Sequence, residues 1–188
     1  MKTLILLLLL FVAQAHAFAQ KPPRTPKFSV YLSAGPNLYL NNFDRFKRFV
    51  EPIHFNLGAR IMWEPASRLS LGLKTGYYHI YTVNFNGKNN GKFTLTAIPI
   101  QTFFTMKIYK GSYILFGMGP SVYHNRISTI KGDVLNASFL SLADVSGGFG
   151  YIERNRKKVS FGAEFEYFFS AKSEENLLSL SLLVRLPL

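Results

Sequence analysis

One stretch of this sequence determines its architecture: Ile53-His54-Phe55-Asn56-Leu57-Gly58-Ala59-Arg60-Ile61-Met62-Trp63-Glu64. Every odd-numbered residue in it is apolar, and the even-numbered residues include His, Asn, Gly, Arg and Glu. Successive side chains of a β-strand point to opposite faces, whereas a helix brings every third or fourth side chain to one face. The alternation therefore predicts a strand with one apolar face and one mostly polar face.

The same alternation recurs along most of the chain. Strand-like segments lie at 28–40, 53–64, 68–82, 92–109, 112–126, 137–151, 157–171 and 177–186. Most exceed the usual five or six residues of a soluble sheet and suit a tilted membrane crossing of about 9 to 11 residues. An even number of strands is typical of bacterial membrane barrels. We therefore predict an all-β fold, an eight-stranded antiparallel up-and-down transmembrane β-barrel.

The fourth segment departs from simple alternation. Phe93 and Leu95 share one parity, whereas Ile98 and most later apolar residues share the other. A β-bulge inserts one extra residue and so reverses the parity of a strand. The sequence predicts such a bulge at 97–99.

The connections between the segments differ in length. Short connections lie at 65–67, 110–111 and 154–156, and longer ones at 41–52, 83–91, 127–136 and 172–176. In outer-membrane barrels short turns face the periplasm and long loops face the exterior. We expect both chain termini on the periplasmic side.

Side-chain volume indicates which face points inward. An eight-stranded barrel is just wide enough for its own side chains to fill. The apolar faces carry Phe, Trp, Tyr and Leu, whereas the opposite faces are rich in Ser, Gly and Asn. The apolar faces are therefore expected to contact lipid, with strand-end aromatics in interfacial girdles: Trp63, Tyr77, Tyr81, Tyr109, Tyr123 and Tyr167. A secreted soluble, lipocalin-like barrel with an apolar ligand inside is the alternative.

The N-terminus has the features of an export signal. Lys2 precedes a Leu-rich run and small residues up to Ala19, so residues 1–19 are predicted to be a cleaved signal peptide. We expect a periplasmic leader at 20–27 and a barrel domain at 28–188, in the outer membrane of a Gram-negative bacterium. The chain has no cysteine and carries a net charge of +12. An exported basic chain points to outer-membrane lipid and lipopolysaccharide as partners, and not to nucleic acid.

Charged residues also occur on the face expected to point inward: Arg60, Glu64, Lys74, Lys107, Asp144, Glu164, Glu166 and Arg185. Buried charges must be paired or hydrated. We expect a lumenal charge network in which Glu164 and Glu166 meet Lys74, Arg60 or Arg185. Structural filling of the lumen is the main interpretation, and a proton-coupled gate or ion path is the alternative.

One long connection mixes aromatic and cationic residues: Phe43, Arg45, Phe46, Lys47, Arg48 and Phe49. Such a mixture suits phosphate groups and sugar rings, so this loop could contact lipopolysaccharide or a partner protein of the envelope. Ordinary packing at the barrel rim, with cation stems covering the rings, explains the same pattern.

Catalytic motifs are absent from the sequence. No G-x-S-x-G or H-E-x-x-H run occurs, and no residues have the spacing of metal ligands. A non-enzymatic protein without a cofactor is therefore expected. A surface lipid or peptide hydrolase using His54 or His124 is the alternative.

Three short motifs carry a family resemblance: Ser33-Ala34-Gly35-Pro36-Asn37-Leu38, Ala97-Ile98-Pro99-Ile100 and Phe116-Gly117-Met118-Gly119-Pro120-Ser121. With them the chain resembles the outer-membrane β-barrel superfamily that includes PorT-like proteins and the OmpA-type eight-stranded barrels. The resemblance implies an outer-membrane location. Its PorT-like part implies a component or assembly factor of a secretion machine. A structural or interaction role in the cell envelope is expected from the side-chain volumes together with the signal peptide.

Overall fold

The computed structural model describes residues 27–40, 50–65, 68–85, 91–129, 134–153 and 159–188. The predicted signal peptide at 1–19 and the aromatic and basic loop residues at 43–49 lie outside these ranges. No helix within the described ranges has the length and apolar character of a membrane span.

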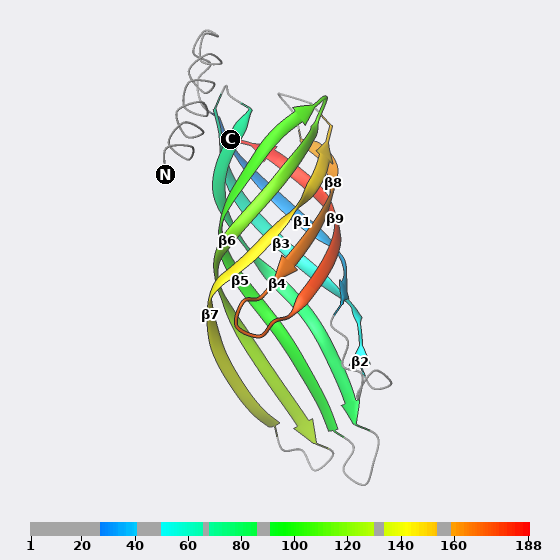
Figure 1. Cartoon of the computed structure of the whole chain (residues 1–188). Coiled ribbons are helices and arrows are strands. Elements are labelled where there is room, and N and C mark those ends of the chain that lie inside the picture. The colour runs from blue at the N-terminus through cyan, green and yellow to red at the C-terminus, as the bar shows by residue number, and fades with distance from the viewer. Residues whose placement is uncertain (1–26, 41–49, 66–67, 86–90, 130–133, 154–158) are drawn as a thin grey trace, which may run out of the picture.

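The described residues form a closed ring of antiparallel strands (Figure 1). The strands are β1 (Lys27–Tyr39), β2 (Val50–Glu51), β3 (Ile53–Glu64), β4 (Leu69–Phe85), β5 (Gly91–Tyr109), β6 (Ser112–Thr129), β7 (Val134–Ile152), β8 (Ser160–Phe169) and β9 (Asn176–Pro187). Each strand from β3 to β8 pairs with the next in sequence, and β1 closes the ring by pairing with β3 and β9. The two-residue β2 pairs with β4. Eight long strands therefore enclose the barrel.

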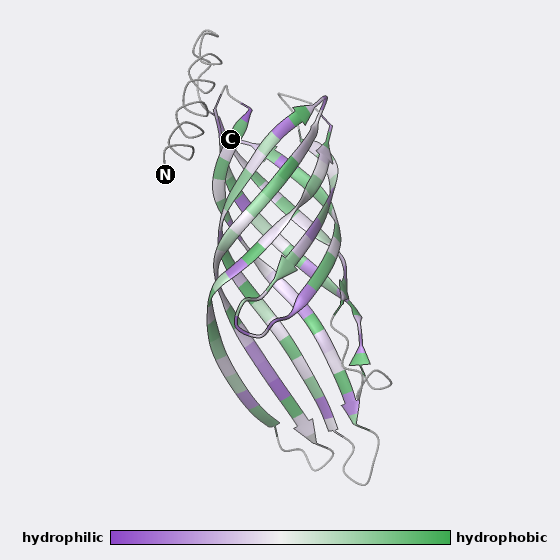
Figure 2. Ribbon diagram, in the orientation of Figure 1, coloured by the Kyte–Doolittle hydropathy of each residue, from purple (hydrophilic) through white to green (hydrophobic). Residues whose placement is uncertain are grey.

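The apolar side chains lie mainly on the outside of this ring. On β3, Ile61 and Trp63 are exposed while Met62 between them is buried. Figure 2 shows the resulting alternation of hydrophobic and hydrophilic residues along the strands. On β5 the outward apolar residues run from Ile98 to Ile108, about ten residues, which at ~3.3 Å each and ~40° of tilt cover ~25 Å, the height of the apolar band of outer-membrane barrels.

The barrel has two different ends. The end that carries Phe28 and Pro187, here called the terminal end, includes the tight turn Lys110–Gly111. Both turn residues have positive φ, 34° and 99°. Paired positive φ values are typical of the two-residue hairpin turn whose twist matches that of the strands, and glycine adopts them without strain.

At the opposite end, here called the loop end, four strands extend beyond the ring. β7 pairs with β6 from Val134 onwards but with β8 only from Val145 onwards. Figure 1 shows β4, β5, β6 and β7 reaching furthest at this end. We call this part of β4–β7 the extension. The long connections predicted at 83–91 and 127–136 are consequently shorter, because Phe85 and Val134 still belong to strands.

The bulge predicted at 97–99 does not occur. The β5 residues Leu95, Ala97, Pro99 and Gln101 are all buried, so the strand keeps its parity. The irregularity lies instead in the partner strand β4, between His79 and Tyr81. Near the loop end the apolar residues of β5 point inward, whereas from Ile98 onwards most of them point outward, with Phe103 as an inward exception.

A second irregularity, in β7, holds the buried carboxylate of Asp144. The register shifts where Gly119 and Ser121 of β6 face Asp144 and Ser141 of β7. The hydroxyl of Ser141 donates to Asp144 Oδ1 at 2.5 Å, and that of Tyr123 donates to Oδ2 at 2.8 Å. The backbone N–H of Ala171 also donates to Oδ1, at 3.2 Å. The carboxylate therefore fastens the loop after β8 to the bulged strand.

Candidate functional site

Two ion pairs cross the middle of the barrel interior. Arg60 on β3 and Lys74 on β4 face each other in the strand register, and Glu164 and Glu166 share the inner face of β8. The guanidinium Nη1 of Arg60 lies 2.7 Å from Glu164 Oε2, and the Lys74 ammonium pairs with Glu166. All four side chains are buried. The strands β3 and β4 are thus linked to β8 through side chains alone.

Aromatic residues complete the environment of these pairs. The hydroxyl of Tyr113 donates to Glu164 at 2.7 Å and accepts from Arg60 Nη2 at 3.1 Å. The guanidinium of Arg60 also lies 4.6 Å from the ring centre of Tyr31 and 4.9 Å from that of Phe103. Burying charges is costly unless each one is paired and hydrogen-bonded. Each of these four charges has a partner of opposite sign and a hydrogen bond to it, while the buried Arg60 Nε has no hydrogen-bond partner among the described residues.

A separate charged group lies near the terminal end. Glu64 accepts two hydrogen bonds from Arg185, from Nε at 3.1 Å and from Nη2 at 3.0 Å. Tyr31 donates to the same carboxylate at 2.5 Å, and the half-exposed Lys107 ammonium lies 3.6 Å away. Arg185 is therefore bonded to Glu64 rather than to Glu164 or Glu166.

The predicted interior residues thus form three separate groups. One contains Arg60, Lys74, Glu164 and Glu166, the second contains Glu64, Lys107 and Arg185, and the third is Asp144 with its hydroxyl partners. The spacing of the two glutamates, two residues apart on one strand, was visible in the sequence. The division into groups depends on strand order and tilt, which a single sequence does not display.

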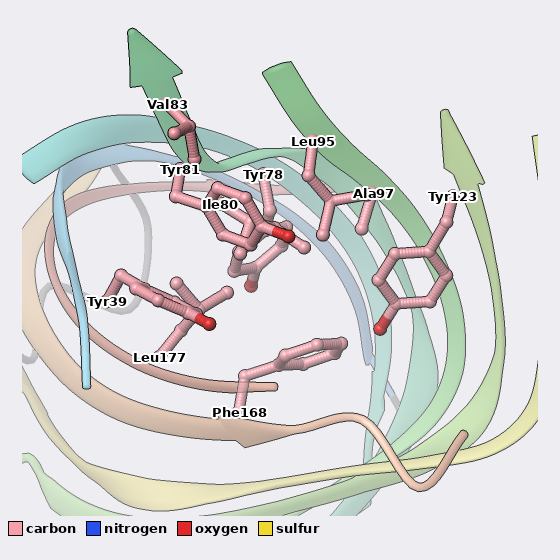
Figure 3. Close-up of a cluster of buried hydrophobic side chains, with 10 residues drawn as sticks. All are labelled: Tyr39, Tyr78, Ile80, Tyr81, Val83, Leu95, Ala97, Tyr123, Phe168 and Leu177. Carbon is pink, nitrogen blue, oxygen red and sulfur yellow. The ribbon is translucent and has the colours of Figure 1, made fainter. Parts of the chain in front are cut away.

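An aromatic and aliphatic cluster occupies the interior near the loop end. Figure 3 shows its side chains converging from opposite walls of the ring: Tyr39, Tyr78, Ile80, Tyr81, Val83, Leu95, Ala97, Tyr123, Phe168 and Leu177. The ring centres of Tyr78 and Phe168 lie 5.4 Å apart, and those of Tyr39 and Tyr81 lie 4.8 Å apart. The cluster bridges β1, β4, β5, β6, β8 and β9.

Two residues of this cluster correct the predicted aromatic girdle. Tyr81 and Tyr123 were expected on the outer surface, but both are buried inside the ring. Tyr77, Tyr109 and Tyr167 are exposed on the outside. The out-of-phase Leu95 was the sequence signal for an apolar interior at this level, and it was attributed to a bulge instead.

The histidines make local polar contacts. His54 and His79 stack with ring centres 3.8 Å apart, and His54 Nε2 lies 2.8 Å from the backbone oxygen of Glu51. His124 Nδ1 lies 2.7 Å from the hydroxyl of Ser138. Within the described ranges, no group of three or more His, Asp or Glu side chains is placed to hold a metal ion.

The closed ring of eight antiparallel strands, apolar outside and charged inside, is the fold of an eight-stranded outer-membrane β-barrel. The predicted fold class and the OmpA-type resemblance are therefore confirmed at the level of fold. No family model matches this chain, and no curated protein matches it.

Two solved structures of bacterial proteins are similar to this chain. Ail, the attachment invasion locus protein of Yersinia pestis, in complex with the heparin analogue sucrose octasulfate, matches with a TM-score of 0.52 and 15% identity, over 87% of this chain and 100% of Ail. Neisserial surface protein A matches with a TM-score of 0.45 and 14% identity, over 88% of this chain and 99% of that chain. At these identities the likeness concerns the fold alone.

Proposed function

We propose that this chain is an integral outer-membrane β-barrel protein with a filled lumen, and that its role in the cell envelope is structural or interactive rather than enzymatic. The observation that carries the proposal is the distribution of side chains. Large apolar residues cover the outside, whereas paired charges lie inside. A soluble lipocalin-like barrel requires the reverse distribution, so the membrane is the environment that fits.

The interior supports the filled lumen. The paired charges of β3, β4 and β8 occupy its middle, and the cluster of Figure 3 occupies the loop end. Eight strands leave room for side chains but for no wide aqueous channel. In this proposal the ion pairs hold the walls of the barrel together, and they do not gate a pore.

The proposed location defines the partners. Lipid surrounds the apolar belt, and lipopolysaccharide contacts the outer surface near the loop end. The basic loop residues 43–49 remain a proposed contact for lipopolysaccharide or an envelope protein. The alternative role, a component or assembly factor of a secretion machine, rests on the PorT-like resemblance. Co-purification of other envelope proteins with the native barrel would favour that role, and recovery of a lone monomer would weigh against it.

Fractionation tests the location and the fold together. The full chain is expressed, outer membranes are separated from soluble material, and the detergent-extracted protein is run on a gel with and without boiling. The proposal predicts sedimentation with outer membranes and a different apparent mass after heating. Recovery as a soluble protein after signal cleavage would contradict it.

A further inference from the structure

The outer wall of the extension changes from apolar to polar at one position in the register of β5, β6 and β7. The last outward apolar ladder is Ile98, Val122 and Leu140; the next two are Thr96, His124 and Ser138, and then Thr94, Arg126 and Asn136. Outward apolar side chains define the part of a barrel wall that contacts hydrocarbon, and polar ones define the part at headgroup level. The two polar ladders therefore begin where the hydrocarbon ends.

A cavity of about 400 Å³ lies on these polar ladders. The exposed side chain of Tyr77 on β4 forms part of its wall, below the polar residues. His124 is fixed on the cavity wall by its contact with Ser138 at 2.7 Å. The described residues that line the cavity thus all belong to regular strands.

The chemistry of the cavity favours an anionic, hydroxyl-rich group. Among the described residues, its lining contains the cation Arg126 and no carboxylate, and Lys92 is the next outward residue of β5 after Thr94. Thr, Asn and Ser side chains provide donors and acceptors for hydroxyl groups. Asn125 and Ala137 also border the cavity, but they share the inward parity of Leu95, so the six outward residues of the two polar ladders supply its polar side chains.

We propose that this cavity binds the phosphorylated sugar headgroup of an outer-leaflet glycolipid, with Arg126 on the phosphate and the ladder of Thr96, His124 and Ser138 on the sugar hydroxyls. The acyl chains lie against the apolar ladder of Ile98, Val122 and Leu140. Tyr77 lies at the boundary between hydrocarbon and headgroups, where its ring contacts apolar groups while its hydroxyl contacts water. The inference rests on the proposed outer-membrane location, and it adds a specific headgroup site to it.

The position of the cavity beside the apolar ladder favours a lipid over a soluble sugar phosphate. A soluble ligand gains nothing from the apolar ladder directly below the cavity, whereas a lipid uses both regions at once. The apolar contact and the phosphate contact therefore reinforce one another in a lipid alone.

Native mass spectrometry of the detergent-extracted barrel tests the site. The wild type, Arg126→Ala, Arg126→Lys and the control Lys172→Ala are each titrated with lipid A, phosphatidylcholine and soluble glucosamine 6-phosphate. Lys172 is a matched cation at the same end of the barrel, where it contacts the ring of Phe139 and lies outside the cavity. Heat-dependent gel mobility shows that each variant is folded before it is titrated.

We expect lipid A to bind the wild type and Lys172→Ala equally and Arg126→Ala about tenfold or more weakly, since a hydrogen bond to a charged group contributes an effect of that order. Arg126→Lys, which keeps the charge, restores part of the affinity. Equal binding of lipid A to the wild type and Arg126→Ala would overturn the site. If phosphatidylcholine bound as tightly as lipid A, the assignment of a phosphorylated sugar headgroup would be wrong. If glucosamine 6-phosphate bound as tightly as lipid A, the ligand would be a soluble sugar phosphate and not a lipid. A soluble, unextracted protein would instead refute the outer-membrane proposal itself.

Discussion

Arg60 and Glu164 form a buried ion pair across the barrel interior, with 2.7 Å between the guanidinium and the carboxylate, although 104 positions separate them in the sequence. Their strands, β3 and β8, share no backbone ladder in the described ring. The pair therefore links two walls that the sheet connects through β1 and β9 on one side and through β4 to β7 on the other.

Removing one partner of this pair should destabilise the barrel strongly. Glu164→Gln leaves the Arg60 guanidinium buried without a counter-charge, and such a change typically costs about 3–5 kcal/mol. We expect a lower urea midpoint for unfolding in detergent and a lower temperature for loss of the fast-migrating gel band.

The double variant Arg60→Met, Glu164→Leu is the matched control for that prediction. Replacement of both charges by apolar groups of similar volume is often neutral or stabilising. The double variant should therefore be more stable than Glu164→Gln. If the single change had no effect on the unfolding midpoint, the interior would have to be hydrated rather than dry.

Two glycines on neighbouring strands test the filled interior. A Cβ atom at Gly117 would lie 2.5 Å from the hydroxyl of Ser146 and 2.8 Å from the ring of Phe103, both inside the barrel. At Gly147 the nearest atom would be 3.9 Å away. Overpacking typically costs about 1–3 kcal/mol, so Gly117→Ala should lower the urea midpoint. Gly147→Ala should leave it nearly unchanged, and equal sensitivity of the two sites would count against a packed lumen.

Exposed leucines should tolerate charge according to their depth. Leu182 on β9 lies on the apolar belt, where an arginine typically costs about 2–4 kcal/mol near the middle of the bilayer. Leu135 is also highly exposed, but it belongs to the extension, beyond the belt, where it shares the parity of Phe93. Leu182→Arg should reduce the heat-modifiable protein recovered from outer membranes, whereas Leu135→Arg should not. Equal recovery of both would argue that no bilayer contacts β9.

A filled lumen also predicts electrical silence. Planar bilayers containing the purified wild-type barrel should show no currents of nanosiemens size, because the aromatic cluster and the ion pairs occupy the cross-section. Steady currents of that size would show that the interior opens.

Period-two alternation was sufficient to predict the eight long strands and the outward apolar face, because a strand that contacts lipid must place its apolar residues on one side. It failed on β5, where Leu95 points inward and Ile100 points outward. Beyond the hydrocarbon nothing favours apolar residues on the outer face, so Leu95 packs inside. The change from inward to outward apolar residues along β5 therefore reflects their depth relative to the membrane, and not a bulge in β5.

The pairing of the interior charges was less predictable. Glu164 and Glu166 were expected to meet Arg60, Lys74 or Arg185, but the choice among these cations depends on which strands face each other across the ring. The cavity on the extension was not predicted either, since it is formed by residues of four strands that the register alone brings together. Strand tilt and register decide both features.

In the proposed barrel the apolar face of each strand contacts lipid, and two adjacent residues of β9 test this directly. Leu182 is 74% exposed and Leu183 is 1% exposed. The chain has no cysteine, so Leu182→Cys and Leu183→Cys each introduce a single thiol for a small fluorophore. After reconstitution into bilayers with spin-labelled lipid chains, the fluorophore at position 182 should be strongly quenched and that at 183 should not. Strong quenching at 183 with none at 182 would show that the barrel is inside out relative to this account.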